Sequence, residues 1–128
     1  MISRLGISML ISTRWPNLTV NCSDRVYADG IDSKLVHKAW RRWKFGWLGF
    51  GGQPLYKDES QDCDDLVRNF IVYFRRKYKV KAKAQPIFYT AYAGHAYVSY
   101  IDENKEVKSM DLRVGKLYEI ESFIVEML

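Results

Sequence analysis

The chain has 128 residues, of which 48% are hydrophobic and 27% are charged. A chain of this length is about one ordinary domain, so we expect a single domain over residues 1–128. The composition supplies a core and excludes a disordered or membrane class. The net charge of +5 is compatible with an anionic partner, such as nucleic acid, cell-wall polymer or membrane phosphate, and equally with a basic soluble surface.

The N-terminal segment and the cysteines bear on the compartment. Residues 1–12 contain an apolar stretch that is interrupted by polar residues, is too short to span a bilayer and has no small-residue cleavage site. We therefore expect a strand or a buried segment, and neither a signal peptide nor a membrane span. Cys22 and Cys63 could form at most one disulfide and have no zinc-ligand spacing. These features predict a reducing compartment and a cytoplasmic location.

Two helices are predicted in the first part of the chain. Asp32 can cap a basic amphipathic helix in which apolar residues recur at helical spacing: Leu35, Val36, Ala39, Trp40 and Trp43. A Gly- and Trp-rich stretch, residues 45–60, breaks the pattern. A second amphipathic helix is predicted over residues 61–79, with Cys63 in its first turn.

The remainder of the chain predicts an antiparallel meander packed on the second helix. Short β-branched and aromatic runs predict strands at residues 80–84, 87–92, 97–101 and 107–112, with a turn at residues 102–105. The last segment, residues 118–128, fits a strand or a helix, and we predict a helix. The expected fold class is α+β, with the second helix packed on a small antiparallel sheet.

Three residues suit nucleophilic catalysis by cysteine. Unpaired N–H groups and a partial positive charge at a helix N-terminus would lower the pKa of a thiol at Cys63. His95 follows a glycine at the start of a predicted strand, and Asp111 lies near the end of the next. Because neighbouring strands bring such residues together, we predict Cys63 as nucleophile, His95 as base and Asp111 as the residue that orients it.

These motifs resemble a known family. Asp62-Cys63-Asp64-Asp65 before a helix, Gly94-His95-Ala96 before a strand and Met110-Asp111 at the end of the next strand resemble the core of bacterial transglutaminase-like cysteine peptidases. They also resemble the papain-like domain of a mushroom agglutinin and its small phage-encoded relatives. The resemblance covers about residues 55–115 and implies a papain-like or transglutaminase-like fold with a Cys-His-Asp triad.

The resemblance also implies an activity. We expect an enzyme, a thiol protease or amidase that cleaves an amide bond in a peptide, a protein or a peptidoglycan stem through a thioester. A transglutaminase-type acyl transferase and a non-enzymatic module that binds nucleic acid or a protein are the alternatives. A phage protein in a host cell is one source that the resemblance suggests.

Further residues are assigned to the expected site. The backbone N–H of Cys63 and the side chain of Gln53 are the expected oxyanion donors, with Trp47, Tyr56 and Gln61 as competitors. We expect no cofactor. The resemblance to the agglutinin-like domain implies one alternative, a regulatory Ca²⁺ held by carboxylates that otherwise only favour the helix N-terminus: Asp62, Asp64 or Asp65.

The aromatic and basic stretch from Trp40 to Tyr56 has two interpretations. Tryptophans between basic residues could stack bases of single-stranded nucleic acid. Glycines beside aromatic residues suit instead the wall of a substrate cleft. We favour the cleft, with Trp47, Tyr56 and Gly94 binding the substrate, and do not expect nucleic acid as the partner.

Overall fold

The computed structural model describes residues 2–16, 18, 26–49, 63–78, 85–122 and 124–126, with the side chains of residues 26, 45–49 and 63 outside the described part. The elements are β1 (Ile2–Ser3), α1 (Arg4–Arg14), β2 (Val26–Tyr27), α2 (Ser33–Gly49), α3 (Cys63–Lys77), β3 (Ile87–Tyr92), β4 (His95–Ile101), β5 (Val107–Asp111), β6 (Lys116–Tyr118) and β7 (Ile124–Glu126). Within the described residues, no helix is long and apolar enough to cross a membrane.

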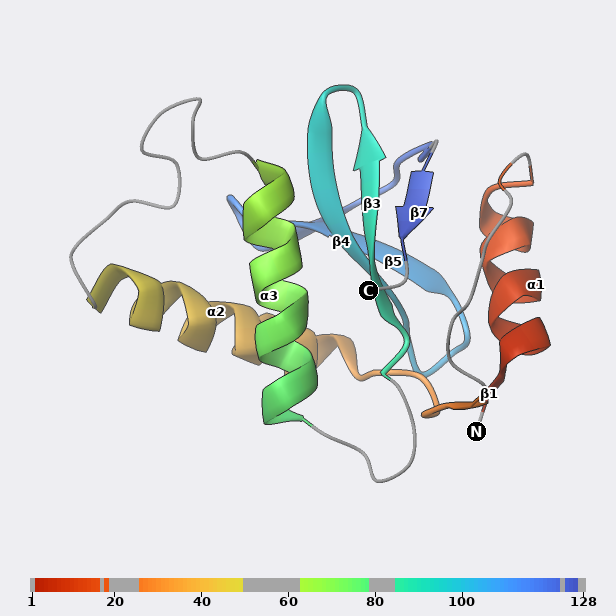
Figure 1. Cartoon of the computed structure of the whole chain (residues 1–128), viewed down its shortest axis with the longest axis horizontal. Coiled ribbons are helices and arrows are strands. Elements are labelled where there is room, and N and C mark those ends of the chain that lie inside the picture. The colour runs from red at the N-terminus through yellow and green to blue at the C-terminus, as the bar shows by residue number, and fades with distance from the viewer. Residues whose placement is uncertain are drawn as a thin grey trace.

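An antiparallel sheet with the strand order β6-β5-β4-β3-β7 forms the centre of the structure (Figure 1). Strands β3 and β4 form a hairpin in which Tyr92 pairs with His95. The two residues between them, Ala93 and Gly94, have φ values of 52° and 79°. Two positive φ values in a two-residue connection match the twist of the flanking strands, so the turn fixes the register of the hairpin.

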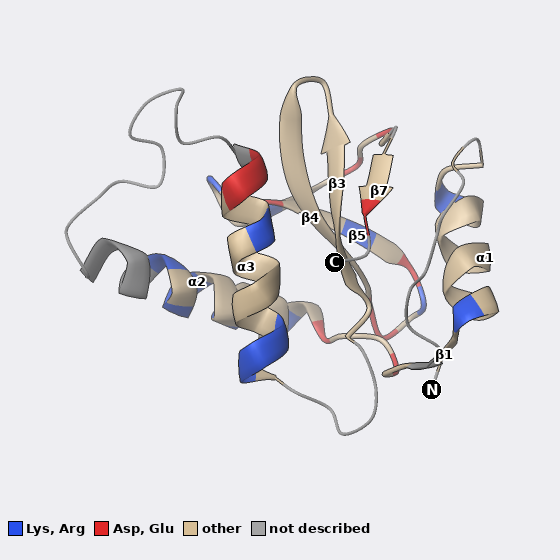
Figure 2. Ribbon diagram, in the orientation of Figure 1, with Lys and Arg blue, Asp and Glu red and all other residues tan. Residues whose placement is uncertain are grey.

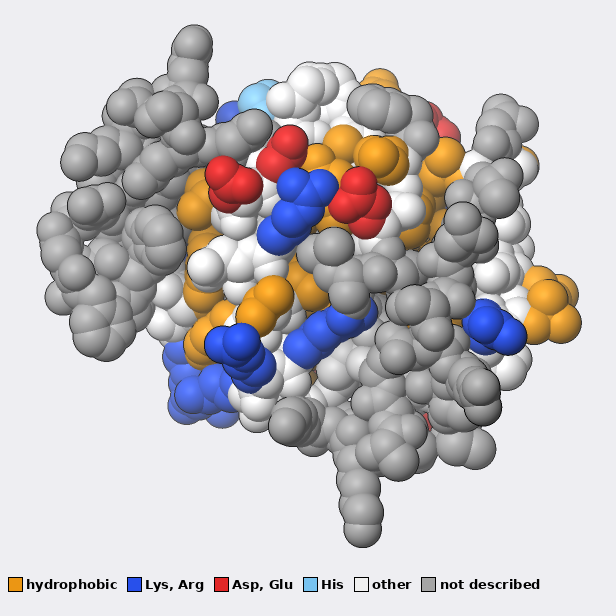
Figure 3. All heavy atoms as spheres, in the orientation of Figure 1, with side chains coloured by type: hydrophobic (Ala, Val, Ile, Leu, Met, Phe, Trp, Pro, Cys, Tyr) orange, Lys and Arg blue, Asp and Glu red, His pale blue; other side chains and the backbone are white. Residues whose placement is uncertain are grey.

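Helices α2 and α3 cover one face of this sheet (Figure 1). The apolar stripe of α3 packs against alternate residues of β3, β4 and β5, among them Tyr89, Val98 and Met110. Two aspartates lie in the first turn of α3 and three basic residues in its last turn, an order that complements the helix dipole (Figure 2). Figure 3 shows acidic and basic side chains on the face of the molecule that is viewed in Figure 1.

Helix α1 packs over the opposite face of the sheet and encloses a second hydrophobic cluster. Ile7 and Ile11, which are four residues apart and fully buried, meet the sheet residues Phe88 and Ile101 there. The N-terminus of α1 is capped by the hydroxyl of Ser3, which accepts a hydrogen bond from the backbone N–H of Gly6 at 3.0 Å. The sheet is thus enclosed on both faces.

Several predicted elements are confirmed. Helices are present in the two predicted regions, as Ser33–Gly49 and Cys63–Lys77. Strands occur at Ile87–Tyr92, His95–Ile101 and Val107–Asp111, and the N–H of Lys105 donates to the carbonyl of Asp102 in the predicted turn. The predicted strand at residues 80–84 lies outside the described residues.

One predicted element is confirmed only in part, and another is wrong. The N-terminal segment, expected to be a strand or a buried segment, has the short strand β1 and buries Ile7 and Ile11. It is mainly the helix α1, because these two residues recur with helical spacing and Ser3 provides a cap. The last segment, expected to be a helix, contains short strands, of which β7 pairs with β3 through Thr90 and Val125. The edge of β3 presents backbone N–H and C=O groups that need hydrogen-bond partners, and the last segment provides them as a strand. The local sequence of that segment does not show this distant partner.

Candidate functional site

His95 and Asp111 lie on the same face of the sheet. His95 is the first residue of β4 and is exposed, and Asp111 is the last residue of β5 and is 5% exposed. Because side chains alternate along a strand, and the neighbours Ala96 and Met110 point into the cluster under α3, both residues belong to the other face. The structure therefore brings two of the three predicted catalytic residues to a common face.

The carboxylate of Asp111 is held by Arg113. The Nε and Nη2 atoms of Arg113 donate to both carboxylate oxygens at 2.7 to 3.1 Å, and its backbone N–H donates at 2.9 Å. Burial by itself would raise the pKa of Asp111, but the hydrogen bonds and the positive charge of Arg113 lower it below its ordinary value of 3.8. Asp111 is therefore an ionised, paired group that stabilises the end of β5.

The other predicted site residues are only partly described. Cys63 begins α3, as predicted, but its side chain lies outside the described residues, as does that of Trp47 in α2. Gln53, Tyr56 and Asp62 lie outside them altogether. The triad and the substrate wall therefore stay predictions.

Gly94 and the aspartates of α3 are described. Gly94 lies at the tip of the β3–β4 hairpin, and in the described structure no atom stands within 4 Å of where its Cβ would be. The carboxylate of Asp64 accepts a hydrogen bond from the hydroxyl of Tyr89 at 2.6 Å, while Asp65 is exposed. Among the described residues, no three His, Cys, Asp or Glu side chains gather to hold a metal ion. A calcium site at these aspartates stays a prediction, because Asp62 is not described.

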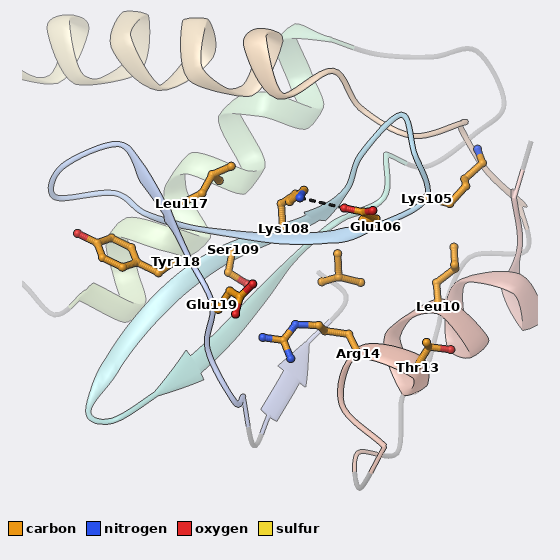
Figure 4. A pocket seen from close by; sticks show the side chains of 11 residues that line it. Leu10, Thr13, Arg14, Lys105, Glu106, Lys108, Ser109, Leu117, Tyr118 and Glu119 are labelled. Carbon is orange, nitrogen blue, oxygen red and sulfur yellow. Dashed lines mark hydrogen bonds and ion pairs between the residues drawn. The ribbon is translucent and has the colours of Figure 1, made fainter.

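A pocket of about 500 Å³ lies between α1 and the β5–β6 edge of the sheet (Figure 4). Leu10, Thr13 and Arg14 come from α1, and Leu117 and Tyr118 from β6. The remaining lining residues lie on β5 or beside the two strands: Lys105, Glu106, Val107, Lys108, Ser109 and Glu119. The pocket therefore combines apolar, hydroxyl, acidic and basic side chains in one concave surface.

A row of buried hydroxyl groups extends inward from the pocket. Ser109 lines the pocket and is 4% exposed, and its Oγ lies 2.8 Å from that of Ser99 on β4. The Oγ of Ser99 lies 2.7 Å from the Oγ1 of Thr90 on β3, which donates to the carbonyl of Tyr97 at 3.0 Å. These bonds satisfy polar groups in a mainly apolar layer and fix their orientation.

Tyr118 provides an exposed aromatic ring beside this row. It pairs directly with Ser109 in the β5–β6 register, so the two side chains lie on the same face. Tyr118 is 46% exposed, and its ring meets the ring of Tyr97 edge to face at a centroid distance of 6.5 Å. The ring of Tyr118 is thus held in place by its contact with Tyr97, and its exposed part is accessible to a ligand.

The charges around the pocket are largely paired. The Nζ of Lys108 donates to Glu106 at 3.0 Å, and this hydrogen bond raises the pKa of Lys108. Arg14 bonds the carboxylate of Glu121 at 3.3 Å and the carbonyl of Ile120 at 2.7 Å. Pairing holds these groups in place as hydrogen-bonding partners while limiting the net charge that a ligand meets.

Sequence reasoning missed this pocket. Its residues come from separate segments, and Tyr118 belongs to a segment for which a helix was predicted. The available signal was the presence of a hydroxyl residue in the interior of each of three neighbouring strands: Thr90, Ser99 and Ser109. Once the register is known, Ser99 and Ser109 lie directly opposite each other, and Thr90 lies diagonally across from Ser99, so the three hydroxyls come within hydrogen-bond reach.

The comparisons with known proteins gave a structural match alone. No family model matches the chain, and no curated protein matches it in sequence. The fold matches a crystal structure of the Polyporus squamosus lectin bound to the human-type influenza-binding epitope Neu5Acα2-6Galβ1-4GlcNAc, with a TM-score of 0.66 and 14% identity. The match covers 92% of this chain and 45% of the lectin chain, so this chain spans less than half of that protein.

This match contradicts the papain-like or transglutaminase-like peptidase fold and family predicted from the sequence. It also contradicts the predicted cysteine peptidase or amidase activity and the acyl-transferase alternative. The predicted peptide, protein or peptidoglycan partner is contradicted as well, and nothing supports a phage source. The nucleic-acid- or protein-binding alternative is also unsupported. The prediction depended on three short motifs over about half of the chain, which indicate where a helix and two strands begin or end. Such motifs occur in many different folds, so they do not determine the fold. The fold of this chain is one that it shares with a lectin structure.

Proposed function

We propose that the chain is a carbohydrate-binding module and that the pocket between α1 and the β5–β6 edge holds the sugar. The observation that carries the proposal is the pairing of an exposed tyrosine, Tyr118, with a hydroxyl-lined floor at Ser109. The lectin whose fold it shares was crystallised with a glycan, which makes a glycan the first ligand to test.

The chemistry of the pocket matches that of a sugar ring. A pyranose has an apolar face of C–H groups, which suits the ring of Tyr118, and a rim of hydroxyl groups that both donate and accept hydrogen bonds. Arg14 and Lys108 offer donors, and Glu106 offers an acceptor, as does the hydroxyl of Thr13, whose hydrogen is donated to the carbonyl of Met9 at 2.9 Å. A volume of about 500 Å³ is within the range of pockets for small molecules and accommodates one or two rings.

Isothermal titration with glycans tests the proposal. The probes are Neu5Acα2-6Galβ1-4GlcNAc, named for the lectin crystal, and its neutral part, Galβ1-4GlcNAc. We expect at least one to bind, with millimolar to micromolar affinity. Tyr118→Ala should weaken that binding about fivefold or more, because it removes the apolar platform.

The matched control is Tyr92→Ala. Tyr92 is 39% exposed, close to the 46% of Tyr118, but it lies at the β3–β4 hairpin, away from the residues that line the pocket. It should leave glycan binding unchanged. Absence of binding of both glycans to the wild-type chain, or equal effects of the two substitutions, would refute the pocket as a glycan site.

The cytoplasmic location stays a prediction.

A further inference from the structure

The hydrogen bonds of the buried row have a determined direction. Thr90 Oγ1 donates to the carbonyl oxygen of Tyr97 at 3.0 Å, and a carbonyl oxygen can only accept. A hydroxyl group has one hydrogen, so this bond uses the hydrogen of Thr90. The neighbouring contact of 2.7 Å between Thr90 Oγ1 and Ser99 Oγ therefore requires Ser99 to donate.

The same counting extends to the pocket. Ser99 has given its hydrogen to Thr90, so the contact of 2.8 Å between Ser99 Oγ and Ser109 Oγ requires Ser109 to donate inward. Thr90 and Ser99 are fully buried and Ser109 is 4% exposed, which restricts the access of water that could reverse the row. Ser109 Oγ therefore presents lone pairs to the pocket.

From this direction we infer that the floor of the pocket is an obligate acceptor, and that the ligand is a sugar in which one free hydroxyl group donates a hydrogen bond to Ser109 Oγ. The inference rests on the proposed function and specifies the class of ligand. A glycan in which that hydroxyl group is substituted or replaced by an acceptor would leave the lone pairs of Ser109 facing other lone pairs. Tyr118, paired with Ser109 in the register, would hold the ring at this hydroxyl.

The probes are Galβ1-4GlcNAc and a set of derivatives in which each hydroxyl of its galactose ring is replaced, one at a time, by hydrogen or by fluorine. Hydrogen removes the donor, whereas fluorine removes the donor and leaves a weak acceptor. For one position we expect the wild-type chain to bind the deoxy derivative about fivefold more weakly than the parent sugar. The fluoro derivative should bind more weakly still.

Thr90→Val provides the decisive comparison. This substitution keeps the branched shape and removes the hydroxyl that accepts from Ser99. Ser99 is then expected to donate to Ser109, whose hydrogen is released toward the pocket. At the same sugar position, the fluoro derivative should now bind more tightly than the deoxy derivative, which reverses the wild-type order. Circular dichroism establishes that the variant is folded.

A neutron diffraction structure of the deuterated chain tests the row without any sugar. The deuterium of Ser109 should point toward Ser99 Oγ, and that of Ser99 toward Thr90 Oγ1. A deuterium of Ser109 directed into the pocket would overturn the inference, as would a parent sugar that binds while every fluoro derivative binds equally well. If the parent sugar does not bind at all, the proposed function fails, and the neutron structure alone decides the polarity of the floor.

Discussion

Gly94 and Gly115 form a natural pair for measuring how tightly α2 packs on the sheet. Both have left-handed backbones, with φ values of 79° and 69°. In the described structure, a Cβ at Gly94 would meet no atom within 4 Å, whereas a Cβ at Gly115 would lie 2.5 Å from the ring of Trp40. Substitution by alanine therefore adds the same backbone strain at both positions and a steric clash at the second.

The size of each effect follows from these distances. Alanine in the left-handed region costs about 1–2 kcal/mol of stability, which is the whole expected effect of Gly94→Ala. At Gly115 the ring of Trp40 must also retreat by roughly 1 Å to reach an ordinary contact. That ring is buried and donates from Nε1 to the carbonyl of Leu112 at 2.7 Å, so its movement strains a hydrogen bond. Overpacking of this kind adds about 1–3 kcal/mol.

Urea unfolding followed by tryptophan fluorescence gives both free energies on the same scale. We expect Gly94→Ala to lower the free energy of unfolding by about 1–2 kcal/mol and Gly115→Ala by about 2–5 kcal/mol, with unchanged denaturant slopes. Equal losses would show that the loop around Gly115 moves away from Trp40 without cost. That result would refute the tight packing of the β5–β6 loop on α2.

Three further changes test other contacts. Gly30→Ala should destabilise the chain by more than about 3 kcal/mol in a thermal melt, because its Cβ would lie 1.7 Å from the backbone oxygen of Asp102. A loss of stability as small as that of Gly94→Ala would contradict the close contact between Gly30 and the backbone of Asp102. Asp111 has a lowered folded pKa, so its contribution to stability is fully present above its ordinary pKa of 3.8 and is lost as the pH falls through the folded value. Urea midpoints from pH 6 to pH 2.5 should fall less steeply for Asp111→Asn than for the wild type, and parallel curves would contradict the shift. Trp15→Phe should cost about 0.5–1.5 kcal/mol in urea unfolding, because it removes the 2.8 Å bond from the indole to the carbonyl of Ile120 while Arg14 still donates to that carbonyl, and an unchanged midpoint would contradict that bond.

The elements that sequence predicts well have more than one local signal. Helix α3 has a stripe that includes Leu66, Phe70 and Phe74, acidic residues in its first turn and basic residues in its last. Strands β3 and β4 have β-branched and aromatic residues on both sides of a Gly-containing turn. Where periodicity, caps and turns all favour the same structure, the secondary structure of a segment depends little on its contacts with the rest of the chain.

The missed elements depend on contacts distant in sequence. Helix α1 includes Gly6, Ser8 and Ser12, which dilute its apolar pattern, and it is stabilised by burial of Ile7 and Ile11 against the sheet. Strand β7 has three residues and exists through its pairing with β3. The pocket is harder still to predict, because its lining residues become neighbours only after α1, β5 and β6 have packed.

The hydroxyl row connects the fold to the proposed site through the register of the sheet. A slip of one residue between β4 and β5 would exchange the faces, and the apolar pattern opposes it. A slip of two residues keeps the faces, but it would place Ser109 opposite Tyr97 or Ile101 in place of Ser99. Buried hydroxyls would then lose partners at a cost of about 1–3 kcal/mol each. The row therefore opposes the slip that the apolar pattern permits, and the same register sets Ser109 beside Tyr118 in the pocket.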